Sequence, residues 1–405
     1  MKRAALGLLS VILVTSAQQG ARLLIISYDS YAPQLQAFAD WKSKSGLLAR
    51  VVPLSQVGRT QDSIRNYVLN AYNTWNPRPE FLLLVGANTQ IPAYSYFTDN
   101  YFGDMTGDFR AELDVGRWPC RNARQCSVMV SKSLNYERYP SLTDSTWFKK
   151  GTFIVREDPG PDDSIYWSDA RTSCSAMRAS GFSEIDTFSY LQGHNASDVV
   201  SAVNSGRSFI AYRGVATVNW YTPFAVNPSL TTNGFQLPII LSATCMTVSL
   251  VPNESMISDG WLRAGTVNAP KGAVAFFGNT HAASHVAPVR SAICRGFVQA
   301  YFRDSVPFLG QACRAGREQM YSEFGNSTEY QGFTLEGDPT LRYWTAKPVT
   351  ATVTYDSVIP VGSSNFTVQV TRSGVPVRNA LVCVRKGTEV YTWGLTNSSG
   401  QVVLA

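Results

Sequence analysis

The length, composition and charge of this chain describe a folded globular protein. It has 405 residues, of which 44% are hydrophobic and 16% are charged, so it can bury one large core or two medium cores. The net charge of +6 comes from lysine and arginine residues scattered along the whole length, without a basic block or a basic-aromatic cluster. This pattern argues against a nucleic-acid partner and is typical of a solvated surface.

The N-terminus has the three regions of a secretory signal peptide. Lys2 and Arg3 precede the apolar run 4–14, and the small residues 15–17 come before the expected cleavage point. The apolar run is shorter than the roughly 20 residues that span a bilayer. We therefore expect residues 1–17 to be removed and the protein to be secreted or held at the cell surface, with no membrane span in the mature chain. A retained N-terminal anchor is the alternative.

The region 18–140 alternates predicted strands with predicted helices. Its apolar runs of strand length are separated by stretches in which apolar residues recur at helical spacing, an order typical of a parallel sheet with crossover helices. Tyr139 and Pro140 begin a polar connection that marks a subdomain boundary. We predict strands at 23–27, 47–53, 81–85 and 115–117, and helices at 34–45, 63–75 and 125–136.

The region 141–345 repeats this α/β pattern, whereas 346–405 changes to alternating polar and β-branched residues between turns rich in Gly, Pro, Ser and Asn. The last region therefore predicts a small β-sandwich. An immunoglobulin-like sandwich usually needs roughly 100 residues, so we expect this domain to be incomplete or the chain to be a fragment. We predict strands at 152–155, 208–212, 239–243, 272–277, 349–355, 366–371, 380–385 and 390–393, and helices at 168–179, 288–303 and 308–324.

One cysteine stands where a catalytic group is expected. The apolar run from Pro238 to Ala243 has strand length and delivers Cys245 at its C-terminal end. In a sheet covered by helices on both faces, ligands and catalytic groups collect at the carboxyl ends of the strands. A thiol there can act as a nucleophile if one neighbour holds it as thiolate and others stabilise the oxyanion of an acyl intermediate.

The seven cysteines are an odd number, so at least one is unpaired in an oxidising compartment. Cys120 and Cys126 are close enough in sequence to bridge a loop, and Cys294 with Cys313 could tie two neighbouring helices. Most of the seven are equally consistent with small buried apolar residues. No Cys or His spacing matches a zinc site.

Several short motifs follow one another along the chain. Together they resemble the gingipain-type cysteine peptidases, secreted bacterial enzymes with a caspase-like fold followed by an immunoglobulin-like domain. The resemblance implies two caspase-like three-layer α/β subdomains at 18–140 and 141–345, an immunoglobulin-like domain at 346–405, no required cofactor, and Cys245 as the thiol that attacks a peptide carbonyl. The motifs are Leu83-Leu84-Val85-Gly86, Asp114-Val115-Gly116-Arg117, Asn135-Tyr136-Glu137-Arg138, Leu237-Pro238 to Cys245, Gly272-Ala273-Val274-Ala275 and Glu336-Gly337-Asp338-Pro339-Thr340-Leu341.

The position of the family's catalytic histidine is changed in this chain. In the family this histidine lies in a Gly-His-Gly turn after a tyrosine that ends a strand, and Val215 occupies the matching position here. A shift in the alignment would bring Arg213 there. Neither valine nor a guanidinium can accept a proton from a thiol. The oxyanion site depends on backbone N–H groups, which the resemblance places near Gly214 to Ala216 and at Cys245.

Only three histidines can replace the missing one. His194 lies in a polar turn and is interpreted as a surface residue. His281 and His285 follow the strand 272–277, and an imidazole with a pKa near 6.5 suits the role of base. By the resemblance His285 takes the place of an aromatic residue over the substrate pocket. The alternative is that His281 and His285 simply line or cover the cleft.

Acidic residues supply further candidates. Glu157 matches the family's acid that orients the histidine. Asp169 falls near an acid that binds a basic substrate side chain, which implies a preference for Arg or Lys; a carboxylate at a helix N-terminus is the alternative. Asp99, Asp104 and Asp108 lie in a Gly-rich loop and could hold a structural calcium ion, with a solvated loop as the alternative.

Two functions follow from these observations. The first is a secreted cysteine endopeptidase that acts on proteins or peptides, with Cys245 as nucleophile, His285 or His281 as base and Glu157 in support. The second is a catalytically silent relative that serves as a binding, structural or secretion-linked module. The sequence does not encode an oligomeric state that we can predict.

Overall fold

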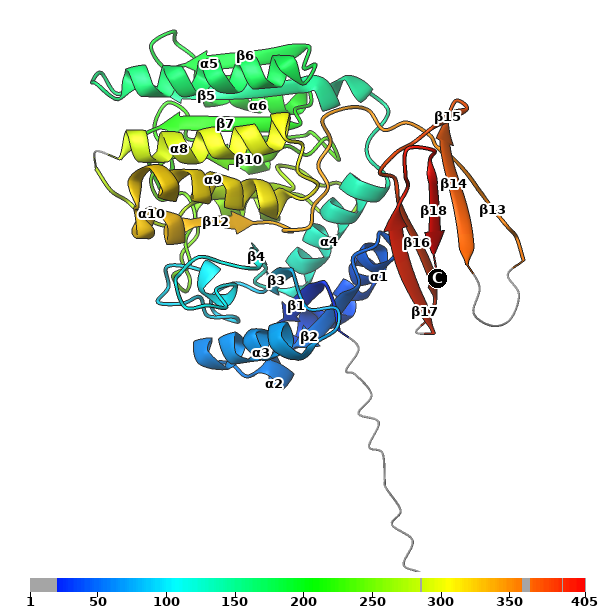
Figure 1. Cartoon of the computed structure of the whole chain (residues 1–405). Helices are drawn as coiled ribbons and strands as arrows, with labels where there is room; N and C mark the ends of the chain where they lie inside the picture. Colours follow the sequence, from blue (N-terminus) through cyan, green and yellow to red (C-terminus); the bar gives the residue numbers. More distant parts are fainter. Residues whose placement is uncertain (1–19, 285, 359–364, 388, 405) are drawn as a thin grey trace, which may run out of the picture.

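The protein is built around one ten-stranded sheet with helices on both faces (Figure 1). The computed structural model describes residues 20–404, except residues 285, 359–364 and 388. The predicted signal peptide at 1–17 lies outside the described residues. The strand order in the large sheet is β2-β1-β3-β4-β12-β11-β10-β7-β5-β6. The predicted α/β class is therefore confirmed.

The first half of the chain forms one end of the sheet. Strands β1, β2, β3 and β4 are parallel, with Leu23 level with Ala49 on one side and with Phe81 on the other. The elements are β1 (Leu23–Ser27), α1 (Gln36–Lys44), β2 (Ala49–Pro53), α2 (Leu54–Val57), α3 (Gln61–Thr74), β3 (Phe81–Val85), β4 (Asp114–Trp118) and α4 (Ala123–Arg138), with short 3-10 helices at Asp29–Leu35 and Asn100–Phe102.

The second half forms the other end. Strands β6, β5, β7, β10 and β11 are parallel to one another, and β7 lies between β5 and β10. The elements are β5 (Lys150–Arg156), α5 (Asp163–Ala179), β6 (Glu184–Ser189), α6 (Ala196–Asn204), β7 (Phe209–Gly214), β8 (Ala216–Thr217), β9 (Asn219–Trp220), β10 (Ile239–Ser242), α7 (Ile257–Arg263), β11 (Ala275–Asn279), α8 (Ala287–Val298), a π-helical turn (Gln299–Arg303), α9 (Leu309–Phe324), α10 (Ser327–Gly332) and β12 (Phe333–Glu336), with 3-10 helices at Ser145–Lys149 and Pro228–Leu230.

Strand β12 joins the two halves. It runs parallel to β4 and antiparallel to β11, so the direction of the sheet reverses between them. The carboxyl ends of β7, β10 and β11 therefore lie at the same edge as the start of β12. This edge is also where α10 ends, which brings α10 close to the residues that follow β10 and β11.

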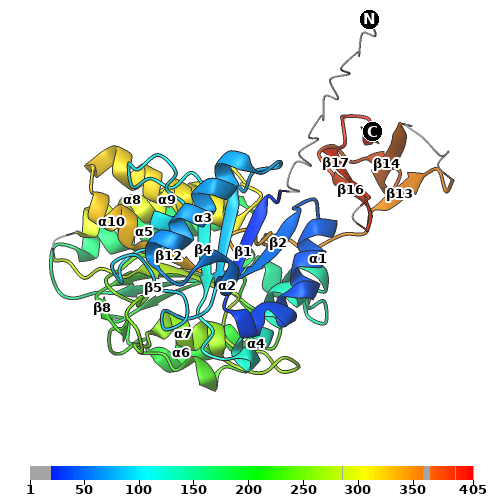
Figure 2. The ribbon, with the colours of Figure 1, turned by 90° about the horizontal axis from the view of Figure 1, so that it is seen from below.

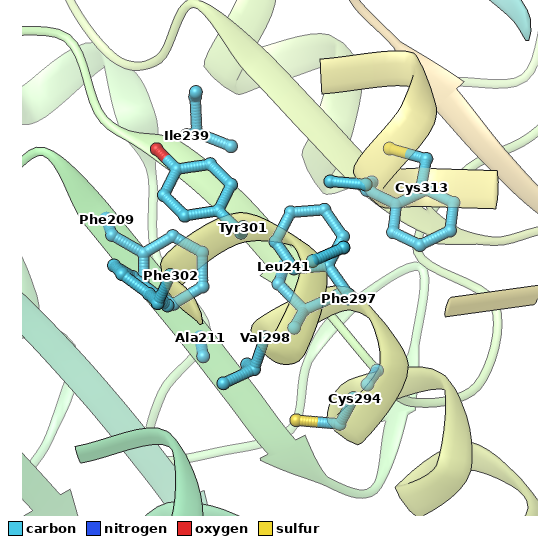
Figure 3. Packing of buried hydrophobic residues seen from close by; sticks show 14 of the residues in the cluster. Phe209, Ala211, Ile239, Leu241, Cys294, Phe297, Val298, Tyr301, Phe302 and Cys313 are labelled. Atoms are coloured by element: carbon cyan, nitrogen blue, oxygen red, sulfur yellow. The ribbon is translucent and has the colours of Figure 1, made fainter. Parts of the chain in front are cut away.

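Successive side chains of the central strands point to opposite faces of the sheet, so the core has two layers. Phe209 and Ala211 of β7 pack with α5, α8 and α9, whereas Ile210 and Tyr212 face the opposite layer with α6 and α7. Figure 3 shows the first face, where aromatic residues of α8 and of the π-helical turn cover β7 and β10. This packing fixes the strand ends from which the site is built. A third cluster, Leu24, Ile26, Leu82, Leu84, Ile64 and Val68 among others, lies between the first sheet half and α3.

The C-terminal region forms two small sheets beside α1 (Figures 1 and 2). They share a core of alternating apolar residues, and the predicted strands in this region are confirmed. Tyr391 donates its hydroxyl hydrogen to the Ser43 carbonyl at 3.1 Å, and the Arg22 guanidinium lies 4.7 Å from the ring centre of Trp393. The immunoglobulin-like assignment stays a prediction. The strands are β13 (Thr352–Tyr355), β14 (Phe366–Arg372), β15 (Val375–Pro376), β16 (Leu381–Lys386), β17 (Val390–Leu395) and β18 (Gln401–Leu404).

Within the described residues, none of the helices is both long enough and apolar enough to cross a bilayer.

Candidate active site

A pocket of about 500 Å³ lies at the carboxyl ends of β7 and β10. Its floor comes from these strand ends and its sides from α5, α8 and the segment that follows β11. This is the position that the sheet topology predicts for a functional site. The lining residues are Asp162, Tyr166, Arg213, Gly214, Val215, Thr244, Cys245, Ala282, Ala283, Ser284, Val286, Ala287 and Arg290.

Cys245 lies three residues beyond the end of β10, where the pocket opens. Its neighbour Thr244 is buried and donates its hydroxyl hydrogen to the Gly214 carbonyl, which ties the end of β10 to the end of β7. Cys245 itself is partly exposed. The structure therefore places this residue in a cleft, as the sequence predicts.

Among the described residues, the side chain that hydrogen-bonds to this sulfur is an arginine that the sequence analysis did not identify. Nη1 of Arg290, from α8, donates to Sγ of Cys245 at 2.8 Å. On another side, Sγ lies 3.5 Å from the Ala283 carbonyl oxygen, which can accept the thiol hydrogen. The sulfur therefore lies between a cationic donor and a carbonyl acceptor.

Arg290 is fixed by a buried carboxylate. Nε and Nη2 donate to the two oxygens of Glu329 at 2.9 and 2.8 Å, and both side chains are buried. Asn279, the last residue of β11, donates to the same carboxylate at 2.9 Å. Burial alone lowers the pKa of Arg290, but the hydrogen bonds and charge of Glu329, with a contribution from Cys245, raise it above its ordinary value. The guanidinium therefore stays charged.

A second buried pair lies on the other side of the pocket. Nε of Arg213 donates to Asp169 at 2.7 Å, and both side chains are almost fully buried. The other guanidinium nitrogens donate to the carbonyls of Ala243 and Ala287, the latter at 2.8 Å. Asp169, the predicted substrate-binding acid, thus has its carboxylate engaged by Arg213 and by the Ser291 hydroxyl. Arg213 connects β7 to α5, β10 and α8.

The predicted oxyanion residues divide between the pocket and its surroundings. Gly214 lines the pocket at a φ of +146°, and a β-carbon there would lie 2.5 Å from the Arg156 carbonyl oxygen, so only glycine fits. Val215, at the histidine position of the family, also lines the pocket. Ala216 is buried and is paired with Trp220 across β8 and β9.

The turn after β8 is anchored beside the nucleophile. Val218 has a φ of +70°, which is unusual for a β-branched residue. Its N–H donates to the carbonyl of Met246 at 3.0 Å, and its carbonyl accepts the N–H of Ile257 at 2.9 Å. This turn, which lies behind the lining residues Gly214 and Val215, is therefore connected to the residue that follows Cys245.

The predicted supporting acid, Glu157, is buried in a different environment. It accepts hydrogen bonds from the Ser189 hydroxyl at 2.5 Å, from the Tyr190 N–H at 2.9 Å and from the Trp167 indole at 3.1 Å. These contacts use both carboxylate oxygens and connect β5 to the end of β6. The structure does not bring Glu157 together with an imidazole in the described residues.

None of the histidines lines the described part of the pocket, so none is placed there as a general base. The ring of His281 packs edge-on against Phe97, with centroids 6.0 Å apart, and His281 is not a lining residue. His194 lies over Phe188, with its Nδ1 3.3 Å from the Ser189 carbonyl oxygen. His285 lies outside the described residues.

Two further lining residues can exchange a proton. Asp162 precedes α5, is partly exposed and is one of the lining residues. Tyr166 lies one turn later on α5, and burial raises the pKa of its phenol. Because helical residues four apart share a face, both face the pocket from α5. This spacing is the signal that could have identified them.

The three predicted calcium ligands are separately engaged. Asp99 accepts two hydrogen bonds from Arg117, each at 2.7 Å. Asp104 accepts the N–H groups of Gly107 and Phe109, and Asp108 accepts the N–H of Arg110. In the described part of the chain, no group of three or more His, Cys, Asp or Glu side chains is arranged to hold a metal ion.

All seven cysteines are free thiols in the structure. Cys120 and Cys126 are both buried, as are Cys294 and Cys313, so neither suggested pair forms a disulfide here. The interpretation as small buried apolar residues describes these four positions.

Comparison with known proteins agrees with this geometry. The sequence model of Peptidase family C25 matches residues 16–344. Gingipain R2 of Porphyromonas gingivalis is 24% identical over 371 residues, which cover 87% of this chain and 50% of the relative. Lys-gingipain of the same species is 21% identical over 416 residues, which cover 94% of this chain and 23% of the relative. The chain therefore spans about half, or less, of the length of these relatives.

Solved structures show the same fold. The crystal structure of the Arg specific cysteine proteinase gingipain R (RGPB) superposes with a TM-score of 0.84 at 19% identity, covering 96% of this chain and 91% of that one. The complex of the Porphyromonas gingivalis RgpB pro- and mature domains gives a TM-score of 0.85 at 19% identity, covering 95% and 92%. The resemblance to gingipain-type peptidases expected from the sequence is confirmed, and with it the caspase-like fold.

Proposed function

We propose, from the premise that this chain belongs to peptidase family C25, that it is an exported cysteine peptidase in which Cys245 attacks the carbonyl carbon of a peptide bond. The observation that carries the proposal is the placement of the Cys245 sulfur. It lies in an open pocket, 2.8 Å from a guanidinium and beside the Gly214 turn.

The proposed reaction follows from the groups around the sulfur. The thiolate forms a C–S bond, the carbonyl oxygen gains the charge, and backbone N–H groups near Gly214 and at Cys245 stabilise it. Collapse of this intermediate breaks the C–N bond, and the amine leaves with a proton. Tyr166 supplies that proton, because it lines the pocket and burial raises the pKa of its phenol. Water then hydrolyses the thioester.

The charge of the pocket supports a preference for a basic substrate side chain. Arg213 is neutralised by Asp169, and Arg290 is neutralised by Glu329. Asp162 is then the remaining acidic side chain in the described lining. A lysine or arginine of the substrate would pair with it. In this proposal Asp162, and not the occupied Asp169, is the specificity residue.

A second function is favoured by one observation. Val215 stands at the histidine position, and none of the described lining residues is an imidazole. A general base contributes roughly 10²- to 10⁴-fold to such reactions, so without one the fold can serve as a peptide-binding module. Export is part of both proposals and is supported by the composition of residues 1–17.

The test uses the full chain without its signal peptide. An acyloxymethyl ketone that carries an arginine side chain is added, and labelling is followed by mass spectrometry together with hydrolysis of peptide amides. We expect labelling of Cys245 and hydrolysis that Cys245→Ala abolishes, whereas Cys383→Ala, a control at another partly exposed thiol, leaves both unchanged. Binding of the peptide with no hydrolysis in the wild type would select the silent module.

A further inference from the structure

We propose that Arg290, held by Glu329, is the counter-ion that keeps Cys245 as a thiolate. In this arrangement the guanidinium supplies the positive charge that a histidine usually places beside a catalytic thiol. Unlike histidine, it does not accept the proton of the thiol. The inference rests on the proposed function for its place in the reaction, but the state of the thiol can be measured without any peptide substrate.

The geometry directs one N–H of Arg290 at the sulfur. Nε and Nη2 form a two-point contact with Glu329, which fixes the plane of the guanidinium and leaves Nη1 pointing to Cys245. Planar two-point pairs of this kind are specific as well as strong. Arg290 therefore has a defined orientation before any substrate arrives.

Glu329, which holds Arg290, is itself fixed at its carboxylate by β11 and at its main chain by the cap of its own helix. Asn279, at the end of β11, donates to Glu329, and the N–H of Glu329 donates to the side chain of Asn326 at 3.0 Å, where α10 begins. Three elements, α8, β11 and α10, thus converge on one guanidinium. Glu329 is a positioning residue, because it acts on the sulfur through Arg290.

Other charged and polar groups around the sulfur modify this effect. The Ala283 carbonyl, at 3.5 Å from Sγ, favours the thiol, but a charge-assisted hydrogen bond is roughly twice as strong as a neutral one. Arg213 is neutralised by Asp169. Among the described residues, the titratable and charged groups that face Cys245 are Arg290 from α8, Arg213 and Tyr212 from β7, and Asp162 and Tyr166 from α5.

A cysteine paired with arginine differs from one paired with histidine in its pH dependence. The imidazolium partner of a Cys–His pair loses its charge as pH rises, whereas a guanidinium stays charged throughout. An ordinary thiol is mostly unreactive below its titration near pH 8.5. The alkylation rate of Cys245 is therefore expected to stay nearly constant from about pH 6 to pH 9.

The experiment measures the rate of iodoacetamide alkylation at each cysteine by peptide mass spectrometry between pH 5 and pH 9. Cys383 is an internal reference, because it is free and partly exposed and because burial raises its pKa. We expect Arg290→Gln to slow the labelling of Cys245 at pH 6 by about 10- to 100-fold and to have little effect at pH 9. Arg290→Lys restores part of the rate, and Glu329→Gln lowers it by a smaller factor.

The matched control is Arg295→Gln, one turn further along α8, where the arginine pairs with Glu323 at the surface. In this variant Cys245 should be alkylated at the same rate as in the wild type. The wild-type profile needs no variant, so it tests the proposal even if Arg290→Gln does not fold. A wild-type rate that rises only near pH 8.5, or a folded Arg290→Gln that labels like the wild type at pH 6, overturns the proposal. Flat labelling with no peptide hydrolysis supports it and counts against the peptidase function instead.

Discussion

Two walls of the pocket are held in place by different means. On the helical wall, which α5 and α8 line and α10 supports from behind, buried carboxylates pair with Arg213 and Arg290. On the turn wall, which the end of β7 lines and the β8–β9 hairpin supports, backbone contacts hold Gly214 against Arg156 and the turn residue Val218 against Met246. Charge pairs thus position the arginines of one wall, and close backbone packing positions the main chain of the other.

The helical wall also shows how similar pairs can differ in role. Every guanidinium nitrogen of Arg213 is used by Asp169 or by main-chain carbonyls. Arg290 has one nitrogen directed to Cys245. The chemistry of the two pairs is the same, and the difference lies in what the remaining N–H groups contact.

Among the substitutions that test this comparison, Arg213→Met is expected to change the free energy of unfolding most. The substitution leaves Asp169 buried with its charge unpaired, which should lower the free energy of unfolding by about 3–5 kcal/mol. The measurement is urea unfolding followed by tryptophan fluorescence. Arg213→Met combined with Asp169→Leu should recover most of the loss, because no charge is then stranded. If the single variant is as stable as the wild type, the pair is not a structural support.

The buried carboxylate of Glu336 can be compared with Asp169 and Glu329, because in the described residues no arginine hydrogen-bonds to it. Glu336, in β12, is buried, and neither of its carboxylate oxygens has a hydrogen bond of good geometry there. Burial, with repulsion from Asp259, outweighs the opposing effects of Ser258, Arg263 and Arg117 and raises its pKa to about 8. Between about pH 4.5 and pH 8 the folded chain then holds a proton that the unfolded chain has released. Stability should fall as pH rises through this window, by up to about 1.4 kcal/mol per pH unit.

Glu336→Gln should remove this dependence and make the protein more stable than the wild type at pH 8. Urea unfolding at pH 5, 6.5 and 8 measures the difference between the two proteins, which should grow with pH. Glu389→Gln, at an exposed position in the C-terminal sheets, is the control and should give a constant difference. A wild-type slope that survives Glu336→Gln would assign the titration to another group.

The smallest change in the free energy of unfolding is expected from a substitution in the turn wall, at Val218. Val218 adopts a positive φ that costs an L-residue with a β-carbon about 1–2 kcal/mol, and glycine avoids this cost at an entropic penalty of about 0.5–1 kcal/mol. Val218→Gly should therefore raise the free energy of unfolding by up to about 1 kcal/mol. Val375→Gly, at an exposed position in strand β15, should lower it instead. Thermal unfolding of the two variants checks the opposite signs.

Much of the fold could be predicted because its central strands are continuous apolar runs. The strands β1, β3 and β10 agree with their predicted ranges within a residue. Strand β6 was not predicted, because its sequence Glu184–Ser189 is polar and only partly buried at the sheet edge. Strand β12 was missed because it has four residues and buries the charged Glu336.

The position of Cys245 in the pocket could be predicted, and its contact with Arg290 could not. Cys245 follows an apolar strand, which is a local signal. Arg290 is 45 residues from Cys245 and 39 from Glu329, so only the folded sheet brings the three together. The available signal was the position of Arg290 on an otherwise apolar face of α8, among Ala287, Ile293 and Cys294. A charged residue at such a position indicates a buried partner, although the sequence does not say which one.

Strand β12 has a consequence for motion. Many enzymes with two lobes admit substrate by swinging the lobes apart. Here β12 forms four residue pairs with β11 of one half and one pair with β4 of the other, so a hinge at the boundary would have to break hydrogen bonds in the middle of the sheet. Under the proposed function, a polypeptide would therefore reach the thiol through movement of the segments around the pocket mouth and not through separation of the two halves.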